Sequence, residues 1–144
     1  PERFTGYHTA LDFEIFPDEK DQDVFVYASC NGPVVLRRWV EGYGGTLVQM
    51  CRIQDQDVTV LYGHLELASI VPSLGDTLNQ GDRIGRLGDD HSEETSNTRK
   101  HLHVAVHKGK DIALRGYVDQ KQALDAYLDP EPLLGYTSST RPSP

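Results

Sequence analysis

Short runs of alternating apolar and polar residues, separated by glycine- and proline-rich turns, fill the first two thirds of the chain. In the first run, apolar Leu11, Phe13 and Ile15 alternate with two acidic residues, which is the two-residue period of a strand with one buried face. Further β-type runs follow at 24–28, 34–40, 46–53, 57–65 and 102–106. Spacings this short predict an all-β fold, mainly one antiparallel sheet, because antiparallel strands can be joined by short turns.

Two Gly-Asp turns lie between the fifth and the sixth of these runs. They occur at Gly75-Asp76 and Gly81-Asp82, six residues apart. This spacing predicts a tight hairpin over 75–85 in which two backbone segments approach closely, because glycine tolerates turn conformations and leaves room for a neighbouring chain.

The C-terminal part of the chain carries a different pattern. Apolar residues at the spacing of one helical face, ended by Pro130, predict a short C-terminal helix over 119–128. The tail over 137–144 contains only Ser, Thr and Pro apart from Arg141, and we expect it to be disordered. Since no repeat or composition shift interrupts the chain, we expect residues 1–136 to form a single domain.

Charge and hydropathy exclude two classes of protein. The 144 residues include 14 Lys and Arg against 22 Asp and Glu, which gives a formal net charge of −8. A surface that binds nucleic acid needs a basic stripe, so we exclude nucleic acid as a partner. The longest apolar runs, such as 24–28, are far shorter than the ~20 residues of a membrane-spanning helix, so we expect no membrane span in this chain.

The two cysteines, Cys30 and Cys51, allow at most one disulfide. Neither belongs to a Cys-x-x-Cys pair of the kind that binds zinc or carries out redox chemistry. A bridge between them would contribute about 3 kcal/mol to the free energy of unfolding in the chain-entropy model. The sequence is equally consistent with buried, reduced thiols, so the pairing stays open.

Six histidines, at positions 8, 64, 91, 101, 103 and 107, are the candidates for chemistry. In a strand, His101 and His103 project from one face with Cα atoms ~6.6–7 Å apart, so one imidazole can bind a metal while the other stays free beside it. His107 lies ~13 Å from His103 along the same face, and His91 stands in the polar stretch 89–100, which we expect to be a solvated surface loop. Histidines on a solvated sheet face would show the same pattern, so His-x-His alone is weak evidence.

Two further motifs strengthen the case for a metal site. In an extended chain His8 and Asp12 would lie ~13 Å apart, too far to share a metal with bonds near 2.0–2.2 Å, so the chain must bend between them if both are ligands. With His103, this pair would supply two nitrogens and one oxygen to Zn²⁺ and leave a fourth position open for water. His64, which follows a predicted strand, and His101 would remain free for proton transfer.

Three motifs occur in an order that is found in one enzyme family: His8-x-x-x-Asp12, Tyr62-Gly63-His64-Leu65 and His101-Leu102-His103. On these motifs the chain resembles the lysostaphin/LytM-type zinc endopeptidases from about Gly6 to Val106. The Gly42-Tyr43-Gly44 loop, the stretch over 75–85 and Asp129-Pro130 near the end also match the family pattern.

The resemblance implies a duplicated-hybrid-motif-type architecture, in which an antiparallel sheet carries a narrow groove with one Zn²⁺ on its floor. Carried over residue by residue, His8, Asp12 and His103 are the metal ligands, and His64 and His101 are the catalytic histidines. The implied activity is a zinc metalloendopeptidase that hydrolyses peptide bonds of bacterial peptidoglycan, with stem-peptide crosslinks as the first expectation and glycine bridges as the second. Which histidine is the general base stays open.

Some positions depart from the family pattern. Arg99-Lys100 replaces the common Gly-Pro before the third motif, and 91–98 lacks the usual glycine-rich stretch. Both lie on the expected groove wall, so they bear on substrate preference rather than on metal binding. The alternative is a non-catalytic, LytM-like regulatory module that activates other cell-wall hydrolases, but such relatives lose ligands, and all five positions are intact here. A carrier domain of lipoyl type would need a lysine over 77–80, where the chain has none.

Peptidoglycan lies outside the cytoplasmic membrane, so the resemblance implies action in the cell envelope (periplasm) or as a secreted protein. The chain starts at Pro1 without a Met, a basic stretch or an apolar leader. We therefore expect it to be part of a longer protein, with flanking segments that could regulate or anchor it.

Overall fold

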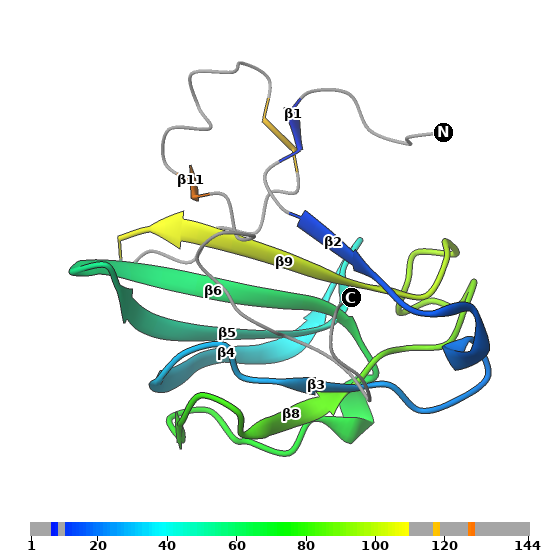
Figure 1. The fold of residues 1–144 in the computed structure, drawn as a ribbon, viewed down its shortest axis with the longest axis horizontal. Coiled ribbons are helices and arrows are strands. Elements are labelled where there is room, and N and C mark those ends of the chain that lie inside the picture. The colour runs from blue at the N-terminus through cyan, green and yellow to red at the C-terminus, as the bar shows by residue number, and fades with distance from the viewer. Residues whose placement is uncertain (1–6, 9–10, 110–116, 119–126, 129–144) are drawn as a thin grey trace.

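The computed structural model describes residues 7–8, 11–109, 117–118 and 127–128, with side chains over 12–109. Strands dominate this part of the chain (Figure 1), and its two helices are single 3₁₀ turns, neither long nor apolar enough to cross a membrane. In chain order the elements are β1 (Tyr7–His8), β2 (Leu11–Glu14), η1 (Pro17–Glu19), β3 (Phe25–Tyr27), β4 (Gly32–Val40), β5 (Gly44–Ile53), β6 (Gln56–Leu65), η2 (Leu67–Ser69), β7 (Thr77–Leu78), β8 (Arg83–Arg86), β9 (His101–Lys108), β10 (Tyr117–Val118) and β11 (Tyr127–Leu128).

Among the described residues seven strands form the main sheet, and each of the pairings between them is antiparallel. The order is β11-β9-β6-β5-β4-β7, and β2 pairs with β9 on the same edge as β11. Gln54 and Asp55 connect β5 to β6 with φ angles of 52° and 61°, which is the conformation of a two-residue hairpin turn. The predicted all-β, antiparallel fold is confirmed, because each long β-type run of the sequence forms a strand.

Strand β9 pairs with a different strand on each of its two edges. On one edge it pairs with β6, where Gly63 lies opposite His103. On the other edge it pairs with β2, where Asp12 lies opposite His103 and Glu14 lies opposite His101. Directly opposite residues of paired strands project from the same face of the sheet, so this register brings β2 and β9 side chains together.

Alternation along β9 separates a core face from a histidine face. Leu102, Val104 and Val106 have 0% exposure and belong to the main hydrophobic cluster, as predicted. Val26 of β3 and Ile84 of β8 belong to the same cluster, so the small β3–β8 sheet, drawn below β4 and β5 in Figure 1, covers this core. Burying one side chain of this size contributes roughly 1.5–3 kcal/mol, which favours this register over a shift by one residue.

The tight hairpin predicted over 75–85 is wrong. Strand β7 pairs with β4, where Leu78 lies opposite Gly32, and β8 pairs with β3, where Gly85 lies opposite Val26. The glycines of the two Gly-Asp turns do reverse the chain, with φ angles of 91° and 92°. A turn signal indicates where the chain changes direction, but the partner of the next strand depends on distant residues.

The short helix predicted over 119–128 is wrong where the structure describes it. Tyr127–Leu128 form β11 and pair with His107 and Val106 of β9. Because β2 pairs only with the first half of β9, the second half has backbone groups available for another strand. The rest of that prediction and the tail over 137–144 lie outside the described residues, and the single domain over 1–136 stays a prediction.

Cys30 and Cys51 form a disulfide, which the sequence left open. Their Cα atoms are 6.2 Å apart, within the usual range for a bridge, and both residues are buried. The bridge joins the segment before β4 to β5. Beside it, the buried Tyr62 hydroxyl accepts a hydrogen bond from the Ser29 N–H at 2.9 Å and donates one to Gln49 Oε1 at 2.7 Å.

Candidate functional site

Four of the five predicted site residues lie together at one end of the sheet. Nδ1 of His103 is 3.1 Å from Oδ1 of Asp12, and Nε2 of His101 is 3.6 Å from the same oxygen. The ring centre of His64 lies 4.5 Å from that of His101 and 5.7 Å from that of His103. His8 is in β1, and its side chain lies outside the described part of the structure.

The three histidines are buried, although a solvated sheet face was one interpretation of their pattern. His64 is 6% exposed, and His101 and His103 are each 4% exposed. Tyr43 packs beside two of them, because its ring centre lies 4.8 Å from that of His103 and 6.4 Å from that of His64. Asp12 is half-buried, with 26% of its side chain exposed, so it is more exposed than the three histidines.

The backbone of His64 has an unusual conformation for a residue with a side chain. Its φ angle is 65°, in the left-handed region that costs a non-glycine residue roughly 1–2 kcal/mol. Its N–H donates to the Tyr43 carbonyl at 2.5 Å. Such strained residues persist where the surrounding structure holds them, and they cluster at functional sites.

The ring of His64 has a defined tautomer when it is neutral. Nδ1 lies 2.7 Å from the Glu94 carbonyl, and a carbonyl only accepts, so Nδ1 carries the proton and Nε2 carries the lone pair. Burial is the largest cause that lowers the pKa of His64, followed by the charge of His101, and together they bring the pKa to about 4. The ring is therefore neutral at neutral pH, with an acceptor nitrogen at Nε2.

His101 has the same arrangement of its two nitrogens. Nδ1 lies 2.6 Å from the Arg99 carbonyl, so Nδ1 donates and the neutral ring has its lone pair on Nε2. That Nε2 faces Asp12 Oδ1 at 3.6 Å. The site thus contains two imidazoles that can each accept a proton at Nε2, which is the property that general acid–base catalysis requires.

The polar stretch over 89–100 is not simply a solvated loop. Thr95 is 0% exposed and Lys100 is 3% exposed. The Thr95 hydroxyl bonds the carbonyls of Ser92 and Thr98 at 3.1 and 2.8 Å, and the Lys100 ammonium donates to the carbonyls of residues 20 and 22. Composition alone predicts exposure here, but these internal hydrogen bonds satisfy the buried polar groups.

Two glycines allow this loop to approach His64. A Cβ atom on Gly44 would overlap the backbone of Glu94, and one on Gly88 would overlap the Glu94 side chain. The Glu94 carbonyl can reach the His64 ring because neither glycine has a side chain. The contact of Glu94 could not be predicted from the sequence, since it is made by a backbone carbonyl and does not depend on residue type. The two glycines are a local sign of this close approach.

The spacing of Asp12 and His103 is close to that of two ligands on one metal ion. Two ligand atoms bonded at 2.0–2.2 Å to a tetrahedral ion are ~3.3–3.6 Å apart, and these two atoms are slightly closer, at the hydrogen-bonding distance of 3.1 Å. A carboxylate oxygen and an imidazole nitrogen are both common zinc donors. Among residues 12–109 no group of three His, Cys, Asp or Glu side chains is arranged to hold a metal, and His8 is not among the side chains described.

The other predicted or possible histidines lie elsewhere. His107 is further along β9 and is paired with Thr59 of β6 and with Tyr127 of β11. His91 is exposed in the polar loop, with Nδ1 2.6 Å from Oδ2 of Asp90.

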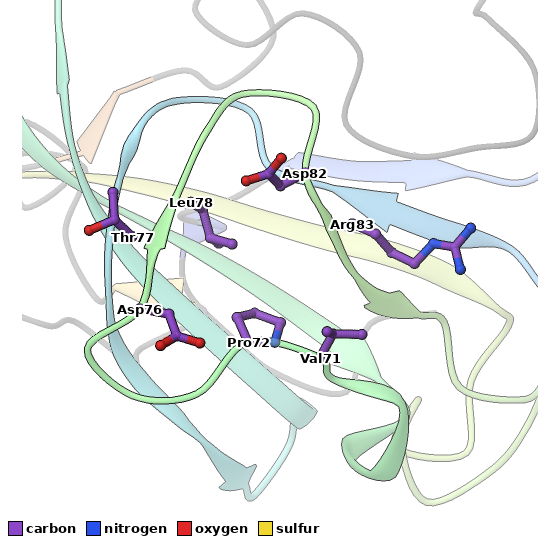
Figure 2. Close-up of a pocket in the computed structure, with 7 residues that line it drawn as sticks. All are labelled: Val71, Pro72, Asp76, Thr77, Leu78, Asp82 and Arg83. Atoms are coloured by element: carbon purple, nitrogen blue, oxygen red, sulfur yellow. The ribbon is translucent and has the colours of Figure 1, made fainter.

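A separate hollow lies beside β7 and the start of β8, away from these histidines. Figure 2 shows its seven lining residues, which include Asp76, Asp82 and Arg83. Each of the two carboxylates accepts a backbone N–H of its own turn at 2.8 Å, from Ser73 and Asn79 respectively. These carboxylates therefore stabilise turns, and none of the predicted site residues lines the hollow.

Comparison with known proteins identifies relatives. A family model described as "Peptidase family M23" matches residues 6–120. Endolysin 2638A of Staphylococcus phage 2638A is 34% identical over 102 residues, which are 70% of this chain and 19% of the phage protein. The chain thus spans about a fifth of the length of that relative.

Three solved structures illustrate proteins with the same fold. The catalytic domain of the antimicrobial peptidase lysostaphin from Staphylococcus simulans has a TM-score of 0.61 at 21% identity, with 87% of this chain and 77% of that chain covered. LytU has a TM-score of 0.64 at 23% identity, with 91% and 74% covered. A zinc-containing peptidase from Vibrio cholerae has a TM-score of 0.52 at 21% identity, with 74% and 31% covered. These similarities confirm the predicted lysostaphin/LytM-like fold.

Proposed function

We propose that this chain, which belongs to peptidase family M23, is a zinc-dependent endopeptidase that hydrolyses peptide bonds of bacterial peptidoglycan. One observation carries the proposal: Nδ1 of His103 and Nε2 of His101 both lie within 3.6 Å of the same Asp12 oxygen, and the His64 ring lies beside His101. These residues come from three strands, and the arrangement combines metal donors with free imidazoles.

His8, Asp12 and His103 would hold the zinc ion. The fit rests on the donor types and on the 3.1 Å between the Asp12 and His103 donor atoms. When bound, zinc lowers the pKa of a coordinated water towards ~7 and polarises the scissile carbonyl. Burial of His103 on the sheet face excludes bulk water from this side of the site, which strengthens the interaction of charged groups there.

His64 and His101 would move protons at Nε2. Each ring donates Nδ1–H to a backbone carbonyl, from Glu94 and Arg99 respectively, which orients the ring and keeps Nε2 available. One ring would take a proton from the attacking water, and the protonated form would stabilise the oxyanion or protonate the leaving amine. The ring centres are 4.5 Å apart, so either ring lies close enough to the other to take one of these roles.

Peptide crosslinks between stem peptides are the first proposed substrate, and glycine bridges are the second. The proposed site of action is the cell envelope (periplasm) or the medium. The similarity to a phage endolysin and to the antimicrobial peptidase lysostaphin supports action on a cell wall. The Cys30–Cys51 disulfide also supports it, because disulfides persist in oxidising compartments outside the cytoplasm.

Digestion of purified sacculi tests the proposal. The purified chain should contain about one zinc ion, and mass analysis of released muropeptides should show newly freed amino and carboxyl ends at one type of peptide bond. A chelator should stop the release, and added zinc should restore it. Full zinc occupancy without any release would contradict the proposed substrate. A chain that retains no zinc and activates another cell-wall hydrolase would instead support the regulatory alternative.

A further inference from the structure

We propose that Arg99, held by Glu14, is a positioning residue that orients the Asp12 carboxylate for metal binding. The inference deepens the proposed function and rests on the proposed zinc site.

Glu14 fixes the plane of the Arg99 guanidinium group. Nε of Arg99 lies 2.7 Å from Oε1 of Glu14, and Nη2 lies 2.5 Å from Oε2. Two parallel hydrogen bonds between a guanidinium fork and a carboxylate restrict rotation more than one bond does. The Arg99 side chain is therefore ordered although 52% of it is exposed.

The same guanidinium group faces the second oxygen of Asp12. Nη2 of Arg99 lies 3.5 Å from Oδ2 of Asp12, whereas Oδ1 faces Nδ1 of His103 at 3.1 Å. The two oxygens of Asp12 thus have different neighbours: Oδ2 faces the Arg99 guanidinium group, and Oδ1 faces the His103 ring. An outer partner of this kind limits rotation of the carboxylate and leaves one oxygen directed at the site.

The sheet register produces this arrangement. Asp12 and Glu14 are two residues apart on β2, so both side chains project from one face. They lie opposite His103 and His101 of β9. Arg99 lies two residues before His101, just ahead of the start of β9. The Arg99 side chain therefore reaches both carboxylates of β2 from the end of β9.

Removal of Arg99 would change zinc affinity in opposite directions through its charge and through its orientation of Asp12. A cation near a zinc site repels Zn²⁺, so loss of the Arg99 charge would tighten binding if charge were its only contribution. Loss of orientation would weaken binding, and removal of outer-shell partners typically costs 10–100-fold in metal affinity. The sign of the change therefore separates the two explanations.

The test measures the zinc affinity of the metal-free full chain by competition with a chromophoric chelator, without any assay of hydrolysis. We expect Arg99→Ala to weaken zinc binding 10–100-fold. Arg99→Lys keeps the charge but lacks the planar fork, so we expect it to weaken binding as well. The double variant Arg99→Ala/Glu14→Gln removes one positive and one negative charge, so the net charge is unchanged. We expect its zinc affinity to stay below that of the wild type.

Arg52→Ala is the matched control, because Arg52 is an exposed arginine that pairs with Asp57 at 3.1 Å on the β5–β6 hairpin. It should leave zinc affinity unchanged. The visible spectrum of the Co²⁺-substituted protein gives a second readout, since altered ligand geometry shifts the bands in the Arg99 variants and not in Arg52→Ala. Tighter or unchanged zinc binding by Arg99→Ala, or wild-type binding by the double variant, would overturn the positioning role. If the wild-type chain itself binds no zinc, the proposed function fails instead.

Discussion

The imidazole of His64 donates Nδ1–H to the backbone carbonyl of Glu94, 30 residues further along the chain, at 2.7 Å. The bond makes the polar loop part of the site, because it orients the ring and fixes its neutral tautomer. Since the acceptor belongs to the backbone, the loop's position matters here and the type of residue 94 does not. Gly44 and Gly88 allow that position.

Gly44→Ala should displace the Glu94 backbone and lower activity. A Cβ at Gly44 would overlap the Glu94 backbone, and the residue also has a φ angle of 68°. Gly42 is the matched control, because its φ angle is 89° and a Cβ there meets nothing within 4 Å. We expect kcat for peptide hydrolysis to fall at least about 10-fold in Gly44→Ala, since general acid–base catalysis contributes 10²–10⁴-fold, while zinc affinity stays unchanged.

Gly42→Ala bears only the backbone strain, so it should lose about 1 kcal/mol of stability and keep its activity. Nitrogen chemical shifts of the His64 ring report the tautomer directly. Equal activity losses in the two variants would show that the contact between Gly44 and Glu94 does not matter for His64.

His103 and His64 should differ in their effect on zinc. His103→Ala removes a proposed ligand, so we expect loss of both zinc and hydrolysis. His64→Asn should keep zinc and lower kcat by roughly 10²–10⁴-fold, and asparagine suits the left-handed backbone at this position. Metal analysis after dialysis and kinetics on the same samples measure both effects. A His64→Asn variant with full activity would remove His64 from the mechanism.

The Cys30–Cys51 disulfide should stabilise the fold without contributing to the site. The two residues are separated by 21 positions, so reduction should lower the free energy of unfolding by about 3 kcal/mol. Urea unfolding with and without a reductant measures this loss. The double variant Cys30→Ala/Cys51→Ala is the control, and its stability should not respond to the reductant. Loss of zinc on reduction under native conditions would contradict a purely structural role.

Tyr62 should make stability depend on alkaline pH. Burial is the largest cause that raises the pKa of Tyr62 from 10.0 to about 12. A group with a raised pKa in the folded state contributes stability that is complete below pH 10 and is lost between pH 10 and 12. By linkage, about 1 kcal/mol of this contribution is lost at pH 11.

Tyr62→Phe supplies the comparison. It leaves the buried Ser29 N–H and Gln49 Oε1 without the hydroxyl, so we expect it to be less stable at pH 8 by roughly 1–3 kcal/mol. The difference in unfolding free energy between this variant and the wild type should be smaller at pH 11, because only the wild type loses the stability that Tyr62 contributes. A difference in unfolding free energy that stays constant from pH 8 to 11 would contradict the raised pKa.

The strands of this protein could be predicted from the sequence because alternation of apolar and polar residues is a local property. The run over 102–106 forms part of β9, and its even-numbered residues enter the core. The order of the three motifs likewise indicated the family and the five candidate residues. Of these, Asp12, His64, His101 and His103 lie together, and their catalytic and metal-binding roles stay predictions.

Only the tertiary structure decided which strands pair and which polar groups are buried. The segment over 75–85 reverses direction as predicted, yet β7 and β8 pair with β4 and β3. The polar sequence around Lys100 predicts an exposed charge, but its side chain is buried against distant backbone carbonyls. The physical reason is that pairing and burial depend on groups that lie far apart in sequence, whereas strand periodicity depends only on neighbours along the chain.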